Sequence, residues 1–71
     1  MYSRKRLKAA LALEGMNQAD LAEALGITRV TMSYKATGRR EFTVSEIQRI
    51  RETLHLSDEQ MISIFFADNV D

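Results

Sequence analysis

Two short amphipathic patterns lie close together in the sequence and leave the chain little choice of fold. The first begins at Asn17, and Gly26 directly follows its end. Its apolar face consists of Leu21, Ala22 and Leu25. Glycine tolerates the positive φ that a sharp turn after a helix requires. The second pattern begins at Thr28, which can accept from a backbone N–H, and places Met32 and Ala36 inward. The segment therefore predicts two helices joined by a tight turn.

Repeated helix-start signals extend this prediction to the whole chain. Thr43 with Glu46 and Ser57 with Gln60 have the spacing of a capping box, in which each side chain accepts from the other residue's backbone N–H. No run alternates as a half-buried strand would. We expect one all-α domain over residues 1–71, with helices at about 3–14, 18–25, 29–37, 44–55 and 58–67 and a frayed tail at 68–71.

Four of the expected helix starts also carry a hydrophobic staple, an apolar residue just before the cap and another five positions later. The pairs are Met16 with Leu21, Ile27 with Met32, Phe42 with Ile47, and Leu56 with Met61. Because each pair clips the incoming chain to the first turn of its helix, the four together fix the helix boundaries to within a residue or two.

Size and composition exclude several classes of protein. A chain of 71 residues leaves no room for a deep catalytic cleft. It has no cysteine and only His55, so it offers neither a thiolate metal site nor a histidine pair. Its apolar runs are far shorter than the ~20 residues of a membrane span, and no signal-type apolar region follows the basic start. We expect a soluble, intracellular protein that is not an enzyme and binds no metal or cofactor.

The formal net charge is zero, but the charges are divided along the chain. Residues 1–40 carry eight Lys or Arg and three acids, a net +5, whereas residues 41–71 carry two Arg and seven acids, a net −5. Such a dipolar molecule can turn a basic face toward phosphates while its acidic end is repelled. Chance segregation on a solvated surface is the alternative.

The sequence resembles the helix-turn-helix repressors of the phage repressor and Cro type, known as the XRE family. The resemblance spans most of the chain: MNQADLAEALGITRVTMS is similar to the family's helix 2, turn and helix 3, and TGRREFTVSEIQRIRETLHLSDEQ resembles its following loop, helix 4 and the start of helix 5. It implies a five-helix lambda-repressor-like DNA-binding domain that uses no cofactor. It also implies that the helix starting after Thr28 enters the major groove.

Carried onto this sequence, the resemblance makes four residues candidate base readers: Arg29, Val30, Ser33 and Tyr34. Their chemistry fits. Arg29 can bond guanine O6 and N7 together, Val30 can contact a thymine methyl, and the two hydroxyls can reach a base edge or a phosphate. The alternatives are a solvated Arg29, a Val30 that only covers the preceding helix, and a Tyr34 that packs on the surface.

Candidate phosphate contacts flank these residues. Gln18 leads them, because in the family a glutamine at this helix start meets a phosphate together with exposed backbone N–H groups. The full set is Asn17, Gln18, Thr28, Thr31, Lys35, Arg39 and Arg40. Asn17 could serve only as a cap, and Arg39 and Arg40 could lie in a purely solvated loop. The basic start at Arg4, Lys5, Arg6 and Lys8 opposes the helix dipole, so it serves either DNA contact or solubility.

The chain departs from the family pattern at two places. Many relatives carry an arginine on helix 1 and a glutamate at the end of helix 3, joined as an ion pair, where this chain has Leu11 and Ala36. Because both partners are replaced by apolar residues, the packing site can persist without a stranded charge. Lys35 stands where an apolar residue is common in the family, so the sequence does not fix the residue at which helix 3 ends.

The last expected helix is rich in large apolar side chains, and a dimer patch is one explanation. Its candidate residues are Ile62, Ile64, Phe65 and Phe66, with Ile64 off the main apolar face. A two-fold homodimer would set two recognition helices about 34 Å apart on an operator with inverted half-sites. Alternatively, Phe65 and Phe66 close the core of the monomer.

We expect a phage-type transcriptional regulator that occupies double-stranded operator DNA and blocks transcription in the cytoplasm of a bacterial host. The resemblance favours a Cro-type regulator from a phage or prophage, because lysogeny repressors usually add a large C-terminal domain. The alternative is a protein-interaction module of the same fold, such as an antirepressor or antitoxin that binds a partner repressor or a toxin.

Overall fold

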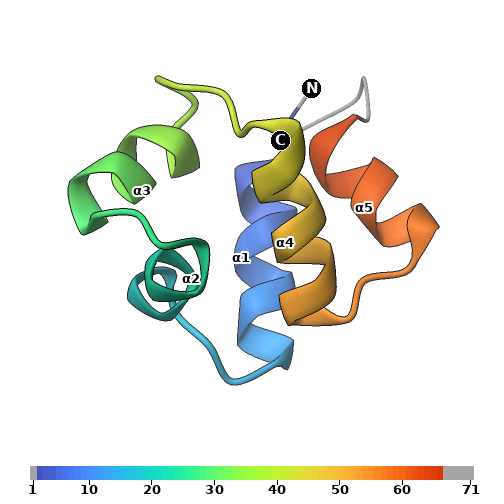
Figure 1. The fold of residues 1–71 in the computed structure, drawn as a ribbon. Helices are drawn as coiled ribbons and strands as arrows, with labels where there is room; N and C mark the ends of the chain where they lie inside the picture. Colours follow the sequence, from blue (N-terminus) through green and yellow to red (C-terminus); the bar gives the residue numbers. More distant parts are fainter. Residues whose placement is uncertain (1, 67–71) are drawn as a thin grey trace.

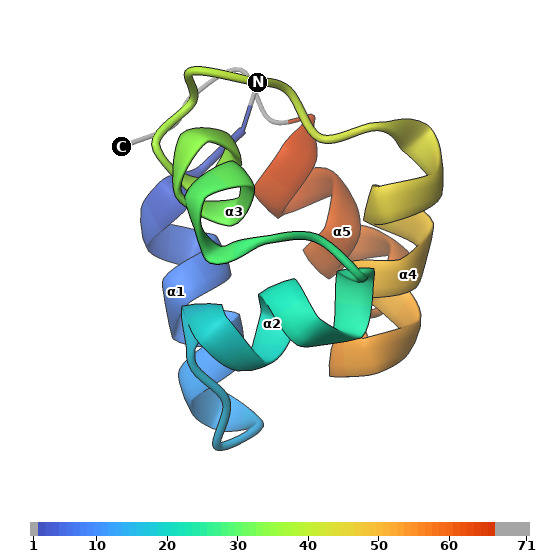
Figure 2. The ribbon, with the colours of Figure 1, turned by 60° about the vertical axis from the view of Figure 1, so that its left-hand side comes forward.

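The computed structural model describes residues 2–66, and the chain forms five helices in that range. They are α1 (Arg4–Leu13), α2 (Gln18–Leu25), α3 (Arg29–Ala36), α4 (Val44–Leu54) and α5 (Asp58–Phe65). In the view of Figure 1, α1 and α4 overlap in the middle, with α2 and α3 on one side and α5 on the other, whereas Figure 2 shows α1 and α4 on opposite sides of the molecule. The all-α prediction is confirmed for these residues.

Four described helices begin where their caps were predicted, and α1 is capped by Ser3, where its start was expected. The caps are Ser3, Asn17, Thr28, Thr43 and Ser57, and each side chain accepts from the backbone N–H three residues later. Three of the starts are complete capping boxes. These local bonds satisfy N–H groups that the first helical turn leaves without partners.

Four helix ends differ from the prediction by one residue or two, whereas α2 ends at Leu25 as predicted. Thr37 and His55 lie just beyond α3 and α4, and His55 closes α4 in the left-handed conformation at φ 55°. Glu14 likewise caps α1, and α5 ends at Phe65. Residue 67 and the expected frayed tail 68–71 lie outside the described residues.

One apolar core joins all five helices, and the residues of the four predicted staples all lie in it or against it. Leu21, Met32 and Ile50 are its most deeply buried apolar side chains. Leu11 and Ala36 are both buried as well, so these two positions bring no charge into the core. The core therefore supports α3 from one side and leaves its other side uncovered.

Three aromatic rings close one end of the core and tie distant segments together. Tyr2 and Phe42 lie edge to face with centroids 5.3 Å apart, and Phe42 and Phe65 do so at 5.6 Å. Tyr2 stacks on Phe65 at 6.0 Å. Because Phe42 belongs to the loop between α3 and α4, this cluster anchors that loop to α5 and to the residues just before α1. Such ring pairs add about 0.5–1.5 kcal/mol each beyond area burial.

Candidate nucleic-acid interface

The turn between α2 and α3 brings the two helices together as predicted. Gly26 ends α2 in the left-handed conformation at φ 70°, where its N–H donates to the carbonyls of Ala22 and Glu23. Thr28 then caps α3, and its Oγ1 accepts from the N–H of Thr31 at 3.1 Å. Only one residue, Ile27, separates the two caps, so α3 starts against α2 with a fixed direction (Figure 2).

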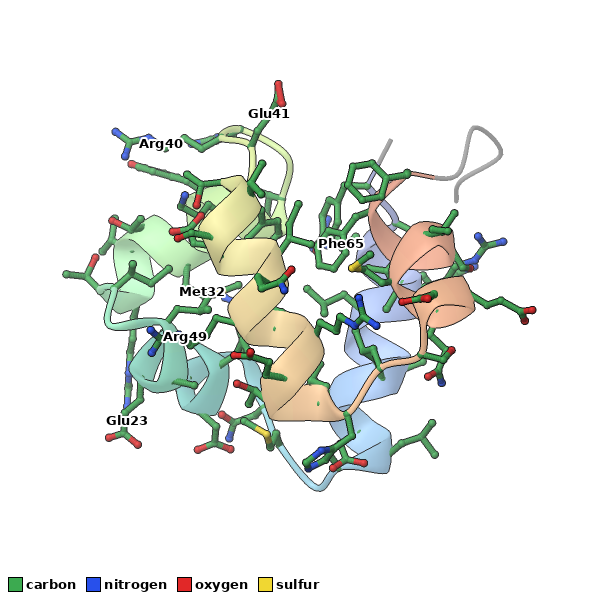
Figure 3. All side chains as sticks on the ribbon, turned by 45° about the vertical axis from the view of Figure 1, so that its right-hand side comes forward. Glu23, Met32, Arg40, Glu41, Arg49 and Phe65 are labelled. Atoms are coloured by element: carbon green, nitrogen blue, oxygen red, sulfur yellow. The ribbon has the colours of Figure 1, made fainter. Side chains whose placement is uncertain are left out.

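The inner side of α3 is held by Met32, which is 1 % exposed and points into the core (Figure 3). The residues predicted to read bases lie on the opposite side. Arg29 and Ser33 are exposed, and 62 % of Val30 is open to solvent. Within residues 2–66, Arg29 forms no ion pair with a carboxylate. The first turn of α3 thus presents a cation and an apolar surface with nothing covering them among the described residues.

Thr28 and Thr31 lie at the same end of α3. The hydroxyl of Thr28 donates to that of Thr31 at 3.0 Å while it accepts the capping bond. Two hydroxyls that share one bond keep one O–H that can donate outward. Their position beside Arg29 is therefore compatible with a phosphate contact.

The start of α2 and one face of α1 line the same hollow. Asn17 forms the capping box with Asp20, with bonds of 2.8 and 3.0 Å, and Gln18 is exposed next to it. Asn17 and Gln18 line a hollow of about 330 Å³ together with Arg4 and Lys8 of α1. Leu7, Leu11, Met32 and Ala36 are among the apolar residues that line it. The hollow therefore combines an apolar floor with two cations and the positive end of α2.

This arrangement separates the basic residues of α1, which sequence alone left as one group. Arg4 and Lys8 are four positions apart and line the hollow next to Gln18. Arg6 instead reaches α5, where its Nη1 donates to the carbonyl oxygen of Ser63 at 3.0 Å and to its Oγ at 2.9 Å. Helical spacing could have shown that positions 4 and 8 share a face, but not that the face adjoins α2.

The loop after α3 presents Arg39 and Arg40, both exposed as predicted. The Cζ atoms of Arg39 and Arg40 lie 5.5 and 5.9 Å from the centroid of the Tyr34 ring. Tyr34 is 37 % exposed at the end of α3. The structure thus gathers these three side chains at the C-terminal end of α3, whereas Arg29 lies at its N-terminal end.

The structure corrects the prediction for Lys35. Only 7 % of this residue is exposed, and its Nζ lies 2.6 Å from Glu46 Oε1 and 3.3 Å from the carbonyl oxygen of Glu41. Its ammonium group faces inward to α4 rather than outward to a phosphate. Sequence reasoning missed Glu46 as its partner because the two residues are eleven positions apart and belong to different helices.

The dimer patch proposed for α5 is also corrected. Ile64 and Phe65 are 3 % and 5 % exposed, so both belong to the monomer core and cannot form an interface. Ile62 and Phe66 remain about half exposed, at 52 % and 54 %. The candidate patch is therefore reduced to these two residues.

Over residues 2–66, no three His, Cys, Asp or Glu side chains gather in a way that could hold a metal ion. In the same part of the chain, every helix is too short or too polar to cross a bilayer.

Comparison with known proteins gives a family match over the first half of the chain. Residues 2–36 match the model of a helix-turn-helix family described as "Bacterial regulatory protein, Fis family". Neither the curated proteins nor the solved structures give a significant match. The matched segment contains α1, α2 and α3, and therefore the turn at Gly26 and the exposed first turn of α3. The match and the all-helical fold of residues 2–66 together support a helix-turn-helix DNA-binding domain of the kind found in bacterial regulators.

Proposed function

We propose that the protein is a sequence-specific transcriptional regulator of the phage Cro or repressor type. It occupies double-stranded operator DNA through the major groove and blocks transcription without catalysis or a cofactor. The proposal places it in the cytoplasm of a bacterial host, encoded by a phage or prophage. The observation that carries it is the first turn of α3, where Arg29 and Val30 are exposed on a helix whose opposite side is fixed by Met32.

Cations on both sides of α3 support the proposal. On one side, Arg4 and Lys8 of α1 line the same hollow as Gln18 at the start of α2. On the other side, Arg39 and Arg40 lie in the loop after α3. Within residues 2–66, none of these four cations is paired with a carboxylate. A helix that enters the major groove has a phosphate ridge on each side, so charges in these two places can contact both ridges.

In this proposal the base-reading residues are Arg29, Val30 and Ser33. Arg29 bonds guanine O6 and N7, and Val30 contacts a thymine methyl. Gln18, Asn17, Thr28 and Thr31 bond phosphates and set the register. The proposal includes a homodimer, for which Ile62 and Phe66 are the exposed apolar residues of α5.

Selection of bound fragments from random duplex DNA tests these roles, followed by affinity measurements on the selected duplex and its single-base variants. Arg29→Ala should relax preference at one base position, because a bidentate contact is worth about 1–3 kcal/mol of discrimination. Gln18→Ala should weaken all duplexes about equally. Arg49→Ala is the charge-matched control, because Arg49 lies on α4 and donates to the carbonyl of Ala24. Uniform weakening by Arg29→Ala would contradict the reading role.

A further inference from the structure

Two hydrogen bonds to the main-chain carbonyl of Tyr34 hold the loop after α3 back over the end of the helix. This carbonyl accepts from the N–H of Arg39 at 2.8 Å and from the N–H of Arg40 at 3.2 Å. Gly38 makes the reversal possible, because its φ of 84° lies in the region that glycine adopts readily. Two consecutive arginines are therefore fixed at the backbone above the residue whose ring they approach.

The side chains of the two arginines meet at the Tyr34 ring. Both guanidinium carbons lie within 6 Å of its centroid, at 5.5 and 5.9 Å. This is the range in which a cation is attracted by the negative face of an aromatic ring. One ring thus holds two guanidinium groups in the same region of the surface.

The loop is also fixed from below. The Nζ of Lys35 donates to the carbonyl oxygen of Glu41 at 3.3 Å, and Phe42 packs into the aromatic cluster of the core. The two arginines are therefore carried by a segment that is tied down at both ends. The two arginines therefore have fewer accessible positions than arginines on an untethered loop would have.

Neither guanidinium is neutralised by a carboxylate among residues 2–66. Glu41 is the next residue along, but its side chain diverges from that of Arg40 (Figure 3). Two like charges gathered on one ring repel each other, and an anion placed between them would remove that repulsion. A phosphate oxygen accepts charge-assisted hydrogen bonds from guanidinium groups and matches their planar fork.

We infer that Tyr34 is a positioning residue that holds Arg39 and Arg40 as a preassembled clamp for a DNA backbone phosphate. This inference rests on the proposed function, and it changes the expected role of Tyr34 from base reading to support of its two neighbours. The ring is the part of Tyr34 that does this work, and the hydroxyl is dispensable. A base reader would depend on that hydroxyl instead.

The test compares Tyr34→Phe, Tyr34→Leu and the double variant Arg39→Ala/Arg40→Ala on the selected duplex, on its single-base variants and over a range of salt concentrations. Tyr34→Phe should keep the affinity, the base preference and the salt dependence of the original protein. Tyr34→Leu should weaken every duplex alike, by about threefold to tenfold, because the ring's attraction for the two cations is lost. The double arginine variant should lower the salt slope by about 0.9 per phosphate contact removed.

Combining Tyr34→Leu with the double arginine variant distinguishes a positioning role from an independent one. We expect little further loss, because the leucine acts only through the two arginines, whereas fully additive losses would overturn the inference. A base preference altered by Tyr34→Phe would overturn it too, and this variant decides the question even where Tyr34→Leu fails to fold. Failure of the unsubstituted protein to bind any duplex would instead overturn the proposed function.

Discussion

At the scale of single residues, Lys35 and Glu46 decide how firmly α3 is held to α4. Their side chains are 9 % and 15 % exposed and meet at 2.6 Å. Glu46 Oε1 also accepts from the N–H of Thr43, so one carboxylate serves both the ion pair and the cap of α4. Burial alone would raise the pKa of Glu46, but hydrogen bonds from Lys35 and from the Thr43 backbone, with the Lys35 charge, hold this pKa below its usual value.

Glu46→Gln should therefore destabilise the protein at pH 7 by about 2 kcal/mol, because it leaves the Lys35 ammonium buried without a counterion. A lowered carboxylate pKa contributes stability above the pKa of the unfolded chain, about 4.3, and this stability is lost as the pH falls through the folded-state pKa. The difference between the two proteins should thus shrink as the solution is acidified toward pH 3.

Urea unfolding from pH 7 to pH 3 measures this difference directly. Glu23→Gln serves as the control, because Glu23 is exposed on α2 and forms no ion pair within residues 2–66. A Glu46→Gln protein that stays less stable by the same amount at every pH would contradict the account of this carboxylate.

Sequence reasoning located Lys35 on the correct helix but placed its side chain on the wrong side. Caps and staples are decided by residues three to five positions apart, so they can be predicted from short segments. The partner of a buried charge is decided by which helices pack together. Glu46 was identified correctly as part of a capping box, yet nothing in its local spacing indicated its second bond to Lys35.

At the scale of elements, α5 shows why a helix can be predicted correctly while its buried face is not. The sequence predicted an apolar stripe that leaves Ile64 out, but the structure places Met61, Ile64 and Phe65 inward. Both stripes have helical periodicity, and they differ only in a rotation of the helix about its axis. The rotation is set by contacts with distant residues, such as the bond from the N–H of Ser3 to the carbonyl of Ile64 and the stacking of Tyr2 on Phe65.

The face of α1 that lines the hollow beside α2 gives a prediction at the same scale. Arg4→Gln and Lys8→Gln should each weaken binding to all duplexes alike, because each removes a phosphate contact and not a base contact. Arg4→Gln should also raise the free energy of unfolding slightly, by about 0.3 kcal/mol, because a cation in the first turn opposes the helix dipole.

Affinity and unfolding measurements on the same variants separate the two effects. Arg49→Gln removes the same charge from α4 and should change the affinity much less. Equal losses from Lys8→Gln and Arg49→Gln would mean that only net charge matters, and the hollow beside α2 would then have no part in binding.

At the scale of the whole molecule, the unequal charge of the two parts of the chain has a structural counterpart. The exposed cations that flank α3 all come from the first 40 residues. In contrast, seven of the ten acids come from residues 41–71, and of these Asp58 forms an ion pair with Arg51. A molecule divided in this way approaches a polyanion with α3 foremost, although its net charge is zero.

The proposed homodimer also belongs to this scale. Ile62→Lys should shift a dimer toward monomer in sedimentation experiments without unfolding the protein, because about half of this side chain is already exposed. Leu13→Lys is the control, because Leu13 is also an exposed apolar residue but lies at the end of α1 and not on α5. A protein that is monomeric on its operator would remove the dimer from the proposal and leave the reading role of α3 in place.

The salt dependence of duplex affinity tests the central claim, that the exposed side of α3 meets DNA between cations, more directly than any other measurement. A protein that contacts several phosphates should lose affinity linearly in a plot of log affinity against log salt, by about 0.9 per contact. Arg39→Ala and Lys8→Gln should each reduce that slope. Absent or salt-independent binding of the selected duplex would contradict the claim and favour a protein partner for the same surface.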